Sequence, residues 1–163
     1  MDTLRWLHLS DVHFSDGESY EIKRMRDSII DKMKEVFEKN KVDFVVLSGD
    51  LAYQGGGYDA NLKKFIESLV DVSGVSIDEL FIVPGNHDLK RTQMRSVLLN
   101  GMRTEQFKFE KETIEQLQKD FKKYMTFYNK VKGENSNYIY RLVKKEKYNI
   151  FLMNTAFTAG TDE

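Results

Sequence analysis

The stretch FIVPGNHDLK, residues 81–90, contains the only proline of the chain and one of its three histidines. An apolar run, residues 80–83, precedes Pro84 and Gly85. An amide, an imidazole and a carboxylate follow: Asn86, His87 and Asp88. A short apolar run that ends in turn residues is typical of a strand buried on both faces. The stretch therefore predicts a buried strand that presents polar side chains at its carboxyl end.

Two earlier stretches have the same form. LRWLHLSD (4–11) leads into Asp11 and His13, and DFVVLSGD (43–50) ends in Asp50. Apolar residues at spacings of three and four predict helices over 20–40 and within YDANLKKFIESLV, residues 58–70. The order β-α-β-α-β favours parallel strands with helical crossovers. Ligands of such sheets bind beyond the carboxyl ends of the strands, so the three polar clusters are expected to be neighbours.

The rest of the chain has a different pattern. Residues 91–132 are rich in Lys, Glu, Gln and Phe at helical spacing, which predicts a helical insertion or cap over the strand ends. YIYRLV (138–143) and YNIFLMN (148–154) flank the polar KKEK and predict a β-hairpin. The tail after residue 154 shows no pattern of a further element.

Composition excludes several classes of protein. The 163 residues, 40% hydrophobic and 31% charged, are typical of one globular domain. The 25 basic and 26 acidic residues give no overall field towards nucleic acid or anionic lipid. The absence of cysteine excludes disulfides, a thiolate nucleophile and a cysteine zinc site. Because neither a signal peptide nor a membrane-spanning run is recognisable, the sequence predicts a cytoplasmic protein with no membrane partner.

The polar clusters carry ligands for divalent metals. Carboxylate, imidazole and amide oxygen bind manganese, iron, zinc or nickel, and the residue types do not choose among these ions. Hydrolysis of phosphate esters uses two such ions roughly 3.5–4 Å apart. Gly49 allows a close backbone approach, so that Asp50 can bridge two ions. The sequence therefore predicts a divalent-metal centre suited to phosphate-ester hydrolysis among six side chains: Asp11, His13, Asp50, Asn86, His87 and Asp88.

The motifs DVH (11–13), GD (49–50) and GNHD (85–88) resemble the first three motifs of the calcineurin-like metallophosphoesterases. The resemblance covers residues 4–88 closely and the hairpin up to residue 154 more loosely. The residues that flank the motifs are similar to those of the bacterial cyclic-nucleotide-phosphodiesterase branch. It implies an α/β fold, a β-sandwich flanked by helices. It also implies that Asp11 and His13 bind the first metal, Asp50 bridges both, and Asn86 binds the second.

The same resemblance implies roles for the last motif. His87 would face the substrate, stabilise charge on the phosphoryl group and protonate the leaving oxygen, with Asp88 accepting its other ring proton. The family completes its site with a further histidine and a Gly-His-x-His motif, but no histidine follows His87 here. We therefore expect a single domain over residues 1–163 that is the N-terminal part of a longer enzyme. We expect it to bind at most one of two metal ions tightly and to self-associate through exposed sheet.

Three functions follow from this pattern. The leading prediction is a metal-dependent phosphoester hydrolase of EC 3.1 type, a phosphodiesterase or phosphatase, with a cyclic nucleotide as the substrate that the resemblance suggests. One alternative is a metal-dependent nuclease of the same family, which would need a basic groove for nucleic acid. The other is a non-catalytic regulatory module that binds a nucleotide or a protein partner through a vestigial site.

Overall fold

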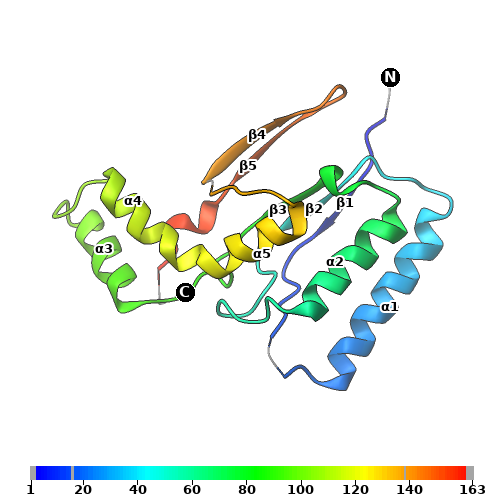
Figure 1. Ribbon diagram of the computed structural model, residues 1–163, viewed down its shortest axis with the longest axis horizontal. Helices are drawn as coiled ribbons and strands as arrows, with labels where there is room; N and C mark the ends of the chain where they lie inside the picture. The colour runs from blue at the N-terminus through cyan, green and yellow to red at the C-terminus, as the bar shows by residue number, and fades with distance from the viewer. Residues whose placement is uncertain (1–2, 16, 138, 161–163) are drawn as a thin grey trace.

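The computed structural model describes residues 3–15, 17–137 and 139–160 (Figure 1). A parallel three-stranded sheet alternates with two helices. Its elements are β1 (Trp6–Leu9), α1 (Tyr20–Phe37), β2 (Phe44–Ser48), α2 (Ala60–Ser73) and β3 (Leu80–Val83). The strand order is β1-β2-β3, so β2 is the central strand. The predicted β-α-β-α-β unit and the α/β fold class are confirmed.

The second part of the chain contains three helices and a hairpin. The helices are α3 (Gln93–Arg103), α4 (Lys111–Gln118) and α5 (Lys122–Lys132), and the antiparallel hairpin pairs β4 (Tyr140–Lys144) with β5 (Asn149–Met153). Short 3-10 helices lie at Ile77–Glu79 (η1), Lys119–Phe121 (η2) and Thr155–Thr158 (η3). The tail that the sequence left without an element thus begins with one turn of helix.

Strand residues alternate between two hydrophobic layers. Val45 and Leu47 of β2, with Leu80 and Ile82 of β3, face a core formed with α2 and α5. The intervening residues Phe44 and Phe81 contact the hairpin through Leu152. The hairpin therefore lies across one face of the parallel sheet, and α1, α2 and α5 lie on the other (Figure 1).

Local capping explains where the helices begin. Ser19 accepts a hydrogen bond from the Ile22 amide at the start of α1, and Asp59 accepts from Asn61 and Leu62 at the start of α2. Such side chains satisfy amides that have no partner within the helix. Gly74 ends α2 with a φ of 70°, a left-handed conformation that glycine adopts without strain.

Two expectations about burial were wrong. β1 is not buried on both faces, because it is an edge strand, and Trp6 is 58% exposed. Helix α1 forms where predicted, but Ile22, Met25, Ile29 and Val36 of its expected apolar face are exposed. Met33 of the expected face does pack on the core, together with Ile30, and both lie in line with the buried Arg26.

Helices α3 and α4 build a second cluster with η3, through Leu99, Leu117 and Phe157. Arg95 of α3 is buried there, forms an ion pair with Asp120 at 3.3 Å and donates to the Phe157 carbonyl at 2.6 Å. Burial lowers the pKa of Arg95, and the carboxylate of Asp120 counteracts this effect. None of the helices in the described part of the chain has the length and apolar composition needed to cross a bilayer.

Candidate metal centre

The loops after β1 and β2 run side by side. The amides of Asp11 and His13 donate to the carbonyls of Gly49 and Asp50, at 3.2 and 2.9 Å. The Phe14 amide continues this pairing with Leu51 at 2.8 Å. The two loops therefore extend the parallel pairing of their strands by several residues, and this holds the backbone of the DVH and GD motifs in register.

The turn after β3 approaches the same place through glycine. A Cβ atom on Gly85 would lie 2.1 Å from Oδ1 of Asp50, and one on Gly49 would lie 3.0 Å from the Cα atom of Gly85. Only glycine therefore allows the second and third loops to touch. The amide of His87 then donates to Oδ1 of Asp50 at 2.9 Å, so the third loop is anchored on the carboxylate itself.

Asp11, His13 and Asp50 all adopt left-handed backbone conformations, with φ of 58°, 49° and 53°. Such residues cost about 1 kcal/mol or more each unless the surroundings hold them, and they concentrate at functional sites. One ligand atom from each of the three side chains lies within 4.8 Å of the others. The strained backbone thus turns two carboxylates and an imidazole towards one point.

Three rings form the neighbouring wall of the site. The ring of His87 meets that of His13 edge to face, with centroids 5.0 Å apart, and stacks on Tyr53 at 5.1 Å. The Nδ1 atoms of both histidines are buried and have no hydrogen-bond partner among the described residues. Nε2 of His13 lies 3.7 Å from Oδ1 of Asp11. Buried polar atoms are normally bonded, so two buried nitrogens without a partner indicate rings that are kept available for a ligand.

Asp88 is buried below this wall. Its carboxylate accepts hydrogen bonds from the amides of Gly85 (2.8 Å), Ala52 (2.9 Å) and Leu51 (3.2 Å), and from the hydroxyl of Tyr58 (2.6 Å). Burial raises the pKa of Asp88, an effect that these hydrogen bonds oppose. Burial also raises the pKa of Tyr58, which therefore stays protonated as a donor.

These contacts differ from the one predicted for Asp88. The family resemblance implied that this carboxylate accepts a ring proton of His87, but Nδ1 of that ring has no partner in the described residues. The four donors come instead from the backbone of the second and third loops and from Tyr58. In this structure Asp88 joins the two loops and supports the turn that carries His87.

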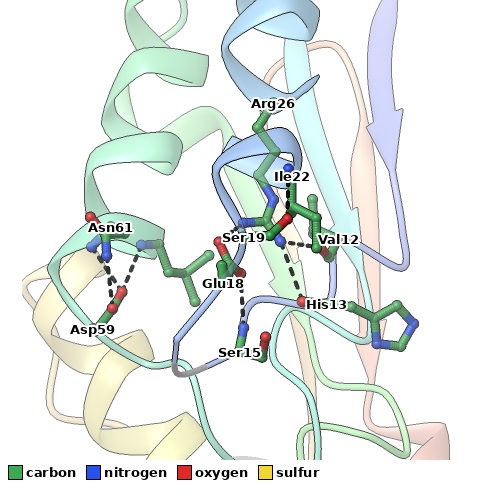
Figure 2. Close-up of polar contacts among 10 residues, drawn as sticks. Val12, His13, Ser15, Glu18, Ser19, Ile22, Arg26, Asp59 and Asn61 are labelled. Carbon is green, nitrogen blue, oxygen red and sulfur yellow. Dashed lines mark hydrogen bonds and ion pairs between the residues drawn. The ribbon is translucent and has the colours of Figure 1, made fainter. Parts of the chain in front are cut away.

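Helix α1 supports the first loop through a buried ion pair (Figure 2). Nη2 of Arg26 donates to the carbonyls of Val12 and His13 at 2.9 and 3.3 Å, and Nη1 contacts Glu18. Glu18 in turn accepts from the amide of Ser15 at 2.9 Å. Figure 2 shows the imidazole of His13 pointing away from Arg26. The guanidinium therefore bonds the backbone of the first loop, and the His13 ring is left to face the site.

The structure thus brings together most of the predicted site residues. Asp11, His13 and Asp50 share one point, and His87 lies against the ring of His13. Asn86 is half-buried in the same turn, and its neighbours on both sides contact Asp50. Sequence reasoning missed Tyr53, Tyr58, Glu18 and Arg26. The available signal was the charged Arg26 between the apolar Ile22 and Ile30 of one helical stripe.

The donor set suits a divalent metal ion. Two carboxylates and an imidazole are ligands that manganese, iron, zinc and nickel accept. The close approach of Gly85 to Asp50 and the unpartnered Nδ1 of His13 are both consistent with a ligand that completes the coordination of these residues. The residues present therefore fit a metal ion at this edge of the sheet.

Comparison with known proteins agrees with this geometry. The model of the family described as calcineurin-like phosphoesterase matches residues 4–158. The chain is also 28% identical to the uncharacterized metallophosphoesterase-like protein YydB of Bacillus subtilis strain 168, over 93% of this chain and 33% of that protein. It thus spans about a third of the length of this relative. With a match over nearly its whole length, the chain belongs to the calcineurin-like phosphoesterase family.

Proposed function

We propose that the chain carries the metal-binding loops of a metal-dependent phosphoester hydrolase. The observation that supports this most strongly is the convergence of Asp11, His13 and Asp50, all in left-handed conformations, with ligand atoms within 4.8 Å of one another. Backbone strain at three residues of one cluster is retained where function requires it. A structural role alone would be served by relaxed loops.

In this proposal Asp11, His13 and Asp50 hold one divalent ion, and Asp50 with Asn86 contributes to a second. Such ions polarise a phosphoryl oxygen and lower the pKa of an attacking water. The ring of His87 lies against that of His13, where it could stabilise charge on the phosphoryl group and donate a proton to the leaving oxygen. Tyr53 and His13 restrict the orientation of that ring.

Several finer predictions stay predictions from the sequence. They are the single domain over residues 1–163, the helical insertion or cap over 91–132, the metal identity, the cyclic-nucleotide substrate and the cytoplasmic location. Because the chain covers only a third of its relative, the activity of the whole protein belongs to the proposal as well.

Hydrolysis of bis(p-nitrophenyl) phosphate with added manganese tests the proposal. Asp50→Asn should abolish metal-dependent turnover, because it removes a charged ligand from the shared position. His87→Ala should slow turnover by about 10²–10⁴-fold, the usual range for a general acid. The matched control is Asp71→Asn, the same change at an exposed position of α2, which should leave the rate unchanged.

Equal rates for the wild type and Asp50→Asn would refute the metal mechanism. Wild-type protein that binds manganese but shows no turnover would instead favour the regulatory-module alternative. The two results are separate, because metal binding is measured without substrate.

A further inference from the structure

A groove with a volume of about 820 Å³ lies between helices α2 and α5. The loop of residues 55–59, which precedes α2, also lines it. Lys63 and Glu67 line it from α2, whereas Lys122, Lys123 and Lys130 line it from α5. Pockets that bind small molecules fall in this range of size.

The α5 lysines that line the groove lack the acidic partner that Lys63 of α2 has. Lys63 pairs with Glu67 at 3.1 Å, and Asp59 is engaged in capping α2. Helix α5 itself contains no acidic residue, and Glu134, four positions after Lys130, pairs with Arg141 at 2.5 Å. Within the described residues none of the three α5 lysines forms an ion pair. The lining therefore carries an excess of positive charge, with four lysines against two carboxylates, Asp59 and Glu67.

The same loop joins the groove to the candidate metal centre. The amide of Gly55 donates to the carbonyl of His87 at 2.8 Å, and Tyr58 donates to Asp88. A Cβ atom on Gly57 would lie 2.1 Å from the carbonyl oxygen of Phe14, so this loop also presses on the one that carries His13. One side of the loop thus faces the groove, and the other contacts the loops of the centre.

We propose that this groove binds the phosphate groups of a multiply phosphorylated ligand, either a polyphosphate chain or a short oligonucleotide. Lysine ammonium groups bind phosphate as point charges without demanding one geometry. Because the groove lies beside the candidate metal centre, it would bind the phosphates next to the phosphate that reacts at the centre. This last step rests on the proposed function, whereas the binding of the anion does not.

Calorimetric titration in EDTA tests the groove without any metal. The probes are inorganic tripolyphosphate and a 5′-phosphorylated thymidine trinucleotide. Lys122→Gln combined with Lys130→Gln should weaken binding about tenfold and reduce the slope of log K against log salt by about one per lysine. Both lysines are exposed, so the fold should be preserved.

The matched control is Lys39→Gln with Lys41→Gln, two exposed lysines before the amino end of β2. This variant carries the same change in charge and should bind like the wild type. Tighter binding of the trinucleotide than of tripolyphosphate would assign the ligand to nucleic acid, and the reverse would assign it to polyphosphates. No binding of either probe by the wild type, or equal binding by the two double variants, would overturn the proposal.

Asp50→Asn separates this inference from the proposed function. Binding of the probes in EDTA should be unchanged in this variant, because the groove contains no residue of the metal centre. If Asp50→Asn hydrolyses phosphoesters normally while the groove still binds the probes, only the proposed metal mechanism fails. If the probes bind Asp50→Asn much more tightly than the wild type, the anion lies at the centre, where loss of a carboxylate reduces repulsion, and the groove assignment fails.

Discussion

At the scale of single residues, the candidate site depends on a buried carboxylate that is not itself among the metal-binding candidates. Asp88 is 1% exposed and accepts four hydrogen bonds from two loops and a tyrosine. A buried charge without such partners would cost several kcal/mol, so each donor matters. The Tyr58 hydroxyl, at 2.6 Å, is the one donor from a side chain.

Tyr58→Phe should therefore lower the free energy of unfolding by about 1.5–3 kcal/mol, the usual value of a hydrogen bond to a charged group. Urea denaturation followed by circular dichroism measures this change. Tyr53→Phe removes a hydroxyl from an exposed ring of the same loop and should change stability by less than about 0.5 kcal/mol. Equal stability of Tyr58→Phe and Tyr53→Phe would contradict the role assigned to Tyr58.

The identity of the metal-binding candidates could be predicted because it follows from sequence order alone. Asp11, His13 and Asp50 each follow a strand, and parallel strands bring their carboxyl ends together. The partners of Asp88 could not be predicted, since they are mostly backbone amides whose direction depends on how two loops fold. The left-handed conformation of Asp11 and His13 is likewise not encoded by residue type.

At the scale of elements, helix α1 is a support for the first loop as much as a layer of the core. Arg26 and Glu18 have side chains that are only 7% and 4% exposed, and together they bond the backbone of Val12, His13 and Ser15. The guanidinium also lies 3.5 Å from the ring centre of Phe14. A buried pair with this many hydrogen bonds is retained to fix a conformation rather than to add stability.

Arg26→Met should leave Glu18 buried without its charged partner and destabilise the fold by about 3–5 kcal/mol. In the Arg26→Met background, Glu18→Gln should recover part of this loss, because the uncompensated charge is then removed. Urea denaturation of the two single variants and the double variant measures the coupling. Additive effects of the two substitutions would show that the pair does not act as one unit.

Periodicity predicted the existence of the helices better than their buried faces. The pattern over residues 20–40 gave a helix, found at Tyr20–Phe37, yet its apolar stripe is mostly exposed. The reason is that the helix turns Arg26 towards the DVH loop, and this rotation moves Met25 and Ile29 out of the core. A helical segment over 91–132 was expected, but the contribution of Tyr124 and Phe127 to the main core depends on tertiary packing.

At the scale of the whole molecule, the hairpin gives the fold its second sheet. Its inner face contacts Phe44 and Phe81, but its outer face presents Tyr140, Leu142, Phe151 and Met153, each at least half exposed. Contiguous apolar patches of this kind are rare on monomeric soluble proteins. The second sheet could be predicted from the hairpin pattern. Its packing across the parallel sheet could not, because it depends on which alternate side chains of β2 and β3 face the hairpin.

We predict that this outer face causes self-association of the chain. Size-exclusion chromatography with light scattering should show a mass above that of the monomer that rises with protein concentration. Leu142→Lys combined with Phe151→Lys, two residues paired across the hairpin, should return the chain to a monomer. Met94→Lys with Val97→Lys, on the exposed face of α3, is the control and should not. A wild-type monomer at all concentrations would contradict the prediction.

Titration of the metal-free chain with manganese measures most directly whether the loops after β1 and β2 create one metal site. We predict one tight ion per chain for the wild type and loss of that binding in Asp50→Asn, with the Asp71→Asn control unchanged. Manganese binding of equal affinity and stoichiometry in the wild type and in Asp50→Asn would contradict the convergence of Asp11, His13 and Asp50 on a shared ion.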